Sequence, residues 1–127
     1  MGGIVGVGVD LCEVGRMSRT LERTPGFAAR VFTEAERAVC DRRRRGAAEG
    51  YAARFAAKEA VLKALGRGLG ACPLRDIEVV RTDSGAPEVA LHGRAAAVAA
   101  EAGVARWHLS LTHTPTTAAA VAVAEGS

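Results

Sequence analysis

The feature that most constrains the fold is a run of helix-forming residues near the middle of the chain, at positions 51–70, with the sequence YAARFAAKEAVLKALGRGLG. Its part from Tyr51 to Leu65 contains neither Pro nor Gly and predicts a helix of about four turns that ends at Gly66. At about 100° per residue, small and large apolar side chains fall on two separate sides of this helix. The small ones are Ala53, Ala56, Ala57, Ala60 and Ala64, and the large ones are Tyr51, Phe55, Leu62 and Leu65. No broad polar side remains, so we expect the helix to be buried.

The same helix carries four charged side chains, and charges on a buried helix need partners. They are Arg54, Lys58, Glu59 and Lys63. Lys58 falls inside the large apolar stripe, whereas Glu59 and Lys63 share a narrow strip one turn apart. A Glu followed four residues later by Lys is commonly a structural pair. The sequence leaves this interpretation open beside a functional one.

The N-terminal segment predicts a strand with one nearly bare face. From Ile4 to Asp10, alternate positions place three valines on one face, and two glycines with Asp10 on the other. Gly in a strand often marks the close approach of another backbone, and the alanine side of the central helix could make that approach. Asp10 would then lie near the charges of the helix. Alternatively, Asp10 caps a helix that begins at Leu11, with Glu13 completing a capping box.

Two helices and a short segment are expected between this strand and the central helix. The first helix, Leu11 to Leu21, exposes Arg16 and Arg19. After the segment from Phe27 to Phe32, Thr33 and Glu36 stand in capping positions and start a helix toward Cys40. The run from Arg42 to Arg45 follows. Four successive arginines usually form a solvated surface, but they are also suited to binding phosphate.

Glycines at positions 66, 68 and 70 follow the central helix. Their order does not match a dinucleotide fingerprint, which opens a helix after a strand, and the GK[ST] of a P-loop is missing. They are equally compatible with a glycine that ends the helix and with a backbone that lies against a ligand.

The C-terminal half predicts two strand pairs and one helix. The segments are Asp76 to Arg81, Pro87 to Leu91, Arg94 to Ala102, Trp107 to His113 and Thr117 to Ala124. Turn-forming residues join the first two segments into a hairpin. His113 ends its strand beside a turn, where a lone histidine is usually a surface or hydrogen-bonded residue. A catalytic role for His113 therefore stays one of two interpretations.

Length and composition favour one α+β domain over residues 1–127. Only 4% of the residues are aromatic although 49% are hydrophobic, so the core is expected to be built from small side chains and to gain stability by self-association. The net charge of +3 suits an anionic substrate and falls short of a nucleic-acid-binding signature. Cys12, Cys40 and Cys72 have neither disulfide nor metal-site spacing, which favours a reducing cytoplasm. We expect no secretory signal, membrane span or membrane partner.

Several motifs together resemble one family. GVGVDLCEVGRM is similar to the N-terminal GIGxDixxxxRi signature of the holo-[acyl-carrier-protein] synthases, the small single-domain 4′-phosphopantetheinyl transferases. RVFTEAE resembles their FTxxE segment, and ARFAAKEAVLKALGRGLG resembles their FAAKEAxxKAlGxGig motif. SGAPEV is similar to their GxP turn, and SLTHTPTTAAAVAVAE to their C-terminal SxsH segment. These motifs span nearly the whole chain in the family order, and the family fold is an antiparallel sheet packed on a long central helix.

The resemblance implies transfer of the 4′-phosphopantetheine arm from coenzyme A to a serine of an apo-acyl carrier protein, with release of 3′,5′-ADP. It also implies a Mg²⁺ ion held by Asp10 and Glu59, which suits a metal that prefers carboxylate and phosphate oxygens. Glu59, directly or through a metal-bound water, is the expected general base. Lys63 would hold the pyrophosphate or protonate the leaving phosphate. His113 matches a histidine at the coenzyme A site across a subunit boundary of a homotrimer.

The remaining binding residues are also carried over from the family. Those expected at coenzyme A are Arg45, Arg54, Phe55, Lys58, Gly66, Gly68, Pro87, His113 and Thr114. Arg16 matches a basic position for docking the acidic helix of the carrier protein. The chain departs from many members at Thr114 and Thr117, where an acidic and an aromatic residue are common.

Two other functions remain as alternatives. A non-catalytic protein that binds coenzyme A or a nucleotide has no use for paired carboxylates, so Asp10 and Glu59 argue against it. A small basic nucleic-acid module built on residues 42–45 would bind with steep salt dependence. The transferase reading leaves open whether the carrier serves fatty acid, polyketide or peptide synthesis.

Overall fold

The central helix, α4, runs from Ala47 to Ala64 in the computed structural model, which describes residues 2–43 and 45–127. It begins four residues before the predicted Tyr51, after the left-handed Gly46. Its end matches the prediction, because Gly66 is left-handed and the backbone N–H of Arg67 donates to the carbonyl of Leu62. The expected burial is also confirmed, since twelve of its residues are buried.

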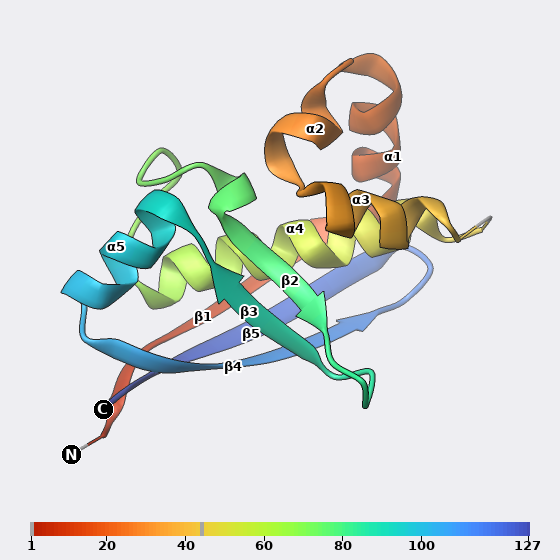
Figure 1. Cartoon of the computed structure of the whole chain (residues 1–127). Coiled ribbons are helices and arrows are strands. Elements are labelled where there is room, and N and C mark those ends of the chain that lie inside the picture. The colour runs from red at the N-terminus through yellow and green to blue at the C-terminus, as the bar shows by residue number, and fades with distance from the viewer. Residues whose placement is uncertain (1, 44) are drawn as a thin grey trace.

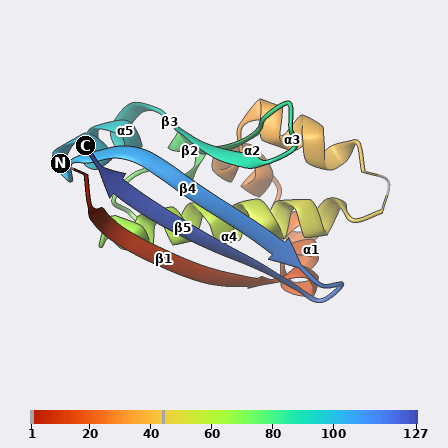
Figure 2. The same cartoon turned by 90° about the horizontal axis from the view of Figure 1, so that it is seen from below.

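An antiparallel sheet lies against one side of α4 (Figures 1 and 2). Its strands are β1 (Ile4–Glu13), β5 (Thr117–Gly126) and β4 (Val104–His113), in the order β1-β5-β4. Four side chains on the side of β1 turned away from α4 are exposed: Val5, Val7, Val9 and Leu11. The view from below shows this three-stranded surface in front of α4. The predicted α+β class, with an antiparallel sheet on a long helix, is therefore confirmed.

The bare face of β1 brings the strand into direct contact with α4. A Cβ atom at Gly6 would lie 1.8 Å from the backbone oxygen of Ala64, and a Cβ at Gly8 would lie 1.8 Å from that of Ala60. Both positions therefore require glycine, as the predicted close approach of the alanine side implies.

The start of the first helix differs from the prediction. β1 continues to Glu13, and α1 runs from Val14 to Arg23 with Glu13 at its N-cap. Asp10 is paired with Ala120 of β5 inside the sheet, so it does not cap a helix. The strand is longer than expected because β5 supplies ladder partners up to the end of β1.

The remaining elements lie on the α4 side of the sheet and beside β4, and they leave the outer face of the sheet uncovered (Figures 1 and 2). They are α2 (Phe27–Val31), α3 (Glu34–Asp41), the short 3-10 helix η1 (Leu74–Asp76), β2 (Ile77–Arg81), β3 (Pro87–Leu91) and α5 (Gly93–Glu101). The predicted hairpin is confirmed as β2–β3, and the predicted capping box of Thr33 and Glu36 is present at α3. None of the helices in the described part of the chain has the length and apolarity that a bilayer crossing requires.

Candidate active site

Asp10 and Lys63 meet where β1 crosses α4. The Lys63 Nζ donates to Asp10 Oδ1 at 2.8 Å and to the carbonyl of Val9 at 3.2 Å. The Lys63 side chain is 53% exposed and that of Asp10 is 17% exposed. The hydrogen bond to Asp10 raises the pKa of Lys63, so this amine is a cation at neutral pH. The predicted proximity of Asp10 to the charges of α4 is confirmed.

Glu59 lies half-buried one turn before Lys63, within electrostatic reach of Asp10. Burial raises the pKa of Glu59, the neighbouring Asp10 carboxylate raises it further, and Lys63 lowers it. Two carboxylates that repel one another form a favourable place for a cation. Among the described residues there is no cluster of three or more His, Cys, Asp or Glu side chains around a possible metal position. Two carboxylates fit Mg²⁺ if substrate phosphate and water complete the ligands.

Cys12 lies beside this group without being suited to nucleophilic chemistry. Burial and the nearby Asp10 carboxylate raise the pKa of its thiol to about 11. The thiol is therefore protonated at neutral pH, whereas a nucleophilic cysteine requires the thiolate. The carboxylate oxygens of Asp10 and Glu59 are therefore better candidates for the chemistry of this site than the Cys12 thiol.

Lys58 has a different environment from the one expected. Its ammonium is fully buried and donates to Glu36 Oε1 at 2.8 Å, to the carbonyl of Leu74 at 3.2 Å and to the carbonyl of Ile77. These three acceptors use all three donors of a lysine ammonium. The structure therefore places Lys58 in the core, where it joins α4 to α3 and β2, instead of at the expected coenzyme A contact.

Arg54 borders a pocket of about 280 Å³ with Val39, Arg43 and Arg81. The Arg54 side chain is buried, and its Nε has no hydrogen-bond partner among residues 2–43 and 45–127. Three guanidinium groups around one pocket repel one another unless an anion binds between them. The pocket is thus suited to a phosphate group.

The sequence prediction included Arg54 and allowed phosphate binding by the run from Arg42 to Arg45, but it missed Arg81. Arg43 belongs to the arginine run, of which Arg44 lies outside the described residues and Arg45 is exposed. Arg81 ends β2, and the hairpin register pairs it with Pro87, which brings that predicted residue beside the pocket. The sequence contains no local signal that would join Arg81 to α4, because the contact depends on how the hairpin packs.

Three other predicted coenzyme A residues have mainly local roles. The ring of Phe55 packs against Phe27 with centroids 6.3 Å apart. Gly66 supplies the left-handed turn that ends α4, and Gly68 is exposed in the following loop.

His113 and Thr114 lie at the far end of β4. The register places His113 across from Ala118 on β5, whereas Asp10 pairs with Ala120 from the opposite edge of the sheet. His113 Nδ1 is 3.0 Å from Glu49 Oε2 at the start of α4. Thr114 organises the turn, since its Oγ1 accepts from the backbone N–H of Thr117 at 3.0 Å. The strand β5 therefore separates His113 from Asp10 within one chain.

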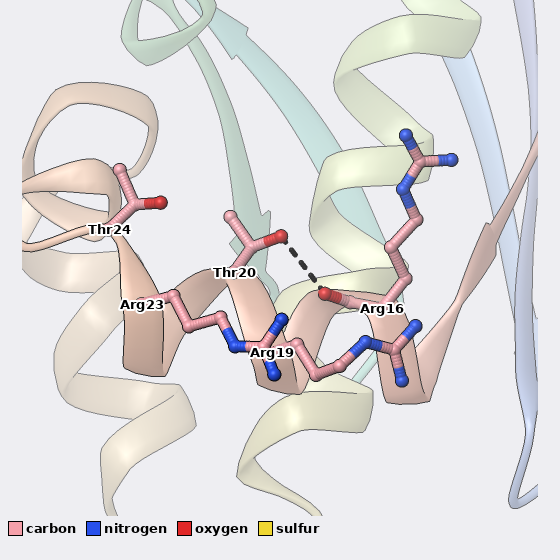
Figure 3. Close-up of a pocket in the computed structure, with 5 residues that line it drawn as sticks. All are labelled: Arg16, Arg19, Thr20, Arg23 and Thr24. Carbon is pink, nitrogen blue, oxygen red and sulfur yellow. Dashed lines mark hydrogen bonds between the residues drawn. The ribbon is translucent and has the colours of Figure 1, made fainter.

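Arg16 belongs to a row of arginines on the exposed side of α1 (Figure 3). With Thr20 and Thr24, the side chains of Arg16, Arg19 and Arg23 line an open pocket of about 310 Å³. The sequence prediction ended this helix at Leu21 and so missed Arg23. This row forms a positively charged surface near the junction between β1 and α1.

Comparison with known proteins agrees with this geometry. The model of the 4′-phosphopantetheinyl transferase superfamily matches residues 6–124. A holo-[acyl-carrier-protein] synthase of Moorella thermoacetica is 52% identical over 120 residues, which cover 94% of this chain and 93% of the relative.

Solved structures agree as well. A Plasmodium yoelii acyl carrier protein synthase with ADP bound has a TM-score of 0.90 at 33% identity, covering 100% of this chain and 98% of that one. A Bacillus anthracis holo-(acyl-carrier-protein) synthase in complex with CoA (3′,5′-ADP) has a TM-score of 0.81 at 36% identity, covering 98% of each chain. The motifs, the fold and these relatives together establish that the chain belongs to the 4′-phosphopantetheinyl transferase superfamily.

Proposed function

We propose that the protein is a holo-[acyl-carrier-protein] synthase, which transfers 4′-phosphopantetheine from coenzyme A to a serine hydroxyl of an apo-acyl carrier protein and releases 3′,5′-ADP. The observation that carries this proposal is the meeting of Asp10, Glu59 and Lys63 at the crossing of β1 and α4. A carboxylate pair beside a cationic amine suits transfer between phosphate and hydroxyl groups. The Bacillus anthracis relative with CoA bound supports the donor substrate.

Asp10 and Glu59 are the residues that would hold the Mg²⁺ ion of the proposed reaction. Bound there, the ion would stabilise negative charge on the pyrophosphate. Burial and the nearby Asp10 carboxylate both raise the pKa of Glu59, and a cation between the two carboxylates would relieve their repulsion, which supports this assignment.

Glu59 is the proposed general base. A carboxylate beside the reacting phosphate, acting directly or through a metal-bound water, can take the serine proton. The serine oxygen then bonds to the β-phosphorus of coenzyme A, and the bond from that phosphorus to the bridging oxygen breaks. Lys63 holds the pyrophosphate or protonates the leaving phosphate, and its cationic ammonium suits the first of these roles.

The second phosphate-bearing part of coenzyme A is assigned to the pocket of Arg54, Arg43 and Arg81. The unpartnered Nε of Arg54 supports this, because a buried donor is costly unless a ligand satisfies it. Arg45, Phe55, Gly66, Gly68, Pro87 and Thr114 remain proposed contacts around the same substrate.

We further propose a homotrimer with active sites between subunits. The exposed apolar side chains of β1, among them Val7 and Leu11, supply an association surface. His113 is remote from Asp10 in its own chain, so it would serve the site of a neighbouring copy. The free thiols of Cys12, Cys40 and Cys72 suit a reducing compartment, and we place the enzyme in the cytoplasm.

The carrier protein is expected to dock on the arginine row of α1. Arg16, Arg19 and Arg23 are exposed on one side of that helix (Figure 3). An acidic helix of the carrier would complement this charge, and long-range attraction would speed the encounter.

The test is to incubate the protein with coenzyme A, Mg²⁺ and an apo-acyl carrier protein and to measure the mass of the carrier. We expect the mass of one phosphopantetheine to be added, and we expect EDTA in place of Mg²⁺ to prevent the addition. Unchanged carrier mass across fatty acid, polyketide and peptide carriers would refute the proposed activity.

The shared site has its own test. We expect Asp10→Asn and His113→Ala each to transfer poorly alone, and a refolded mixture of the two to recover part of the activity, because mixed trimers contain some sites with both residues intact. A mixture no more active than the separate variants would contradict the placement of His113 in a neighbouring site.

A further inference from the structure

A carboxylate outside the proposed reaction residues contacts His113. Glu49 Oε2 lies 3.0 Å from His113 Nδ1, and the side chains are 27% and 39% exposed. Glu49 belongs to the first turn of α4, whereas His113 is the last residue of β4. This close contact therefore joins two elements that are far apart in the sequence, at the point where the proposed coenzyme A contact of His113 would form.

We propose that Glu49 is a positioning residue that fixes the His113 imidazole for coenzyme A. The carboxylate accepts the proton on Nδ1, which selects the tautomer and limits rotation of the ring. Nε2 then carries the free lone pair and accepts a hydrogen bond from an N–H or O–H group of coenzyme A. This inference rests on the proposed function, because the ligand of Nε2 is the coenzyme A bound at a neighbouring copy.

Glu49 does not act on the reacting atoms of its own chain. It lies ten residues before Glu59 on α4, which corresponds to about 15 Å along the helix axis. A carboxylate at that distance affects the site of Asp10 and Glu59 only weakly. Its effect is therefore expected on coenzyme A binding instead of on the chemical step.

The simpler explanation is that Glu49 only stabilises the start of α4, as an acidic residue in the first turn commonly does. That role would be independent of His113. Glu34 offers a matched control, because it is an exposed acidic residue in the first turn of α3. Replacing Glu34 tests the helix-end effect without touching the imidazole.

The experiment is a double-mutant cycle. For each variant, the steady-state rate of phosphopantetheine transfer is measured at several concentrations of coenzyme A. Loss of one orienting hydrogen bond should raise the KM for coenzyme A about three- to tenfold in Glu49→Ala, with little change in kcat. Glu49→Gln should stay within about twofold of wild type, because its amide oxygen still accepts from Nδ1–H. Glu34→Ala should leave KM unchanged.

The decisive comparison is made in the His113→Ala background, where adding Glu49→Ala should have no further effect on KM. Additive effects of the two substitutions, or an equal rise in KM for Glu34→Ala, would overturn the proposal. Either outcome would assign Glu49 to the stability of α4 alone.

Nuclear magnetic resonance of the imidazole nitrogens tests the pair without any enzymatic assay. In the neutral ring, we expect the Nδ1–H tautomer of His113 in the wild type and its loss in Glu49→Ala. A dominant Nε2–H tautomer in the wild type would overturn the proposal. If the wild type shows the expected tautomer but transfers no phosphopantetheine to any carrier, the proposed function fails while the Glu49–His113 pair stands.

Discussion

Two lysines five residues apart on α4 form ion pairs of the same length with opposite surroundings. Lys58 is 2.8 Å from Glu36, and both side chains are fully buried. Lys63 is 2.8 Å from Asp10, but its side chain is 53% exposed. Burial lowers the pKa of Lys58, while the hydrogen bond to Asp10 raises that of Lys63. The distance between charges therefore does not distinguish a structural pair from a functional one.

The two ion pairs differ in whether the lysine can leave its carboxylate partner for another ligand. Glu36 also accepts from the backbone N–H groups of Thr33 and Val79, both at 2.9 Å, so its carboxylate links α3, α4 and β2. The Lys63 ammonium is exposed to solvent, so it can release the partly buried Asp10 carboxylate for a phosphate or a metal ion. The closed pair holds α4 in place, and the open pair is available for chemistry.

The largest expected effect comes from breaking the closed pair with Lys58→Met. Glu36 would keep its backbone donors but lose its buried cation, which typically costs about 3–5 kcal/mol. We expect the free energy of unfolding in urea to fall by that order. Lys63→Met is the matched control, and its unfolding midpoint should remain close to that of wild type. Equal midpoints for the two variants would remove the distinction.

The next effect concerns the contact that brings β1 and α4 together. In Gly8→Ala the new Cβ would lie 1.8 Å from the oxygen of Ala60, so the strand and the helix must separate. Overpacking of this kind costs about 1–3 kcal/mol. Gly3→Ala is the control, because a Cβ there meets no heavy atom of the described residues within 4 Å. Thermal unfolding of both variants checks the prediction, which an unchanged midpoint for Gly8→Ala would contradict.

A smaller effect is expected on activity when the open pair is broken. Lys63→Met removes a charge-assisted hydrogen bond to the pyrophosphate, so kcat/KM should fall about 10- to 100-fold. Carrier mass as a function of time provides the rate. Wild-type kcat/KM in this variant would exclude Lys63 from the reaction.

The smallest effect is a change in the pH dependence of stability. Because the pKa of Glu59 is raised in the folded state, the folded protein holds this proton more tightly than the unfolded chain. Stability should thus decline as the pH rises from the ordinary value of 4.5 through the raised one. Urea unfolding at several pH values should show this decline in wild type and less of it in Glu59→Gln. Parallel curves would mean that Glu59 is not perturbed by its surroundings.

Local patterns in the sequence predicted most of the fold. The length of β1 was wrong, because its last residues are held by pairing with β5 and not by local propensity. Asp10 resembled a helix cap for the same reason. The bare glycine face was informative. The alternation of residues along β1 alone predicted that Gly6 and Gly8 lie against a neighbouring backbone, as they do.

Local sequence patterns predicted less of the candidate site than of the fold. The prediction placed Lys58 at coenzyme A because the sequence does not indicate that Glu36 and the carbonyl of Ile77 converge on it. The contributions of Arg43, Arg81 and Glu49 also depend on tertiary contacts. The motif places residues on one helix, but packing decides which of them remain open to a substrate.

The most direct test of the division between the open site and the closed pair is Glu59→Gln, measured for carrier modification and for unfolding in the same preparation. Removing a general base typically costs about 10²- to 10⁴-fold in rate. We expect the mass-spectrometric rate of phosphopantetheine addition to fall by that order, while the unfolding midpoint stays at or slightly above that of wild type. Near-normal transfer by the folded variant would contradict the account, because neither the proposed base nor the proposed metal ligand would then be needed.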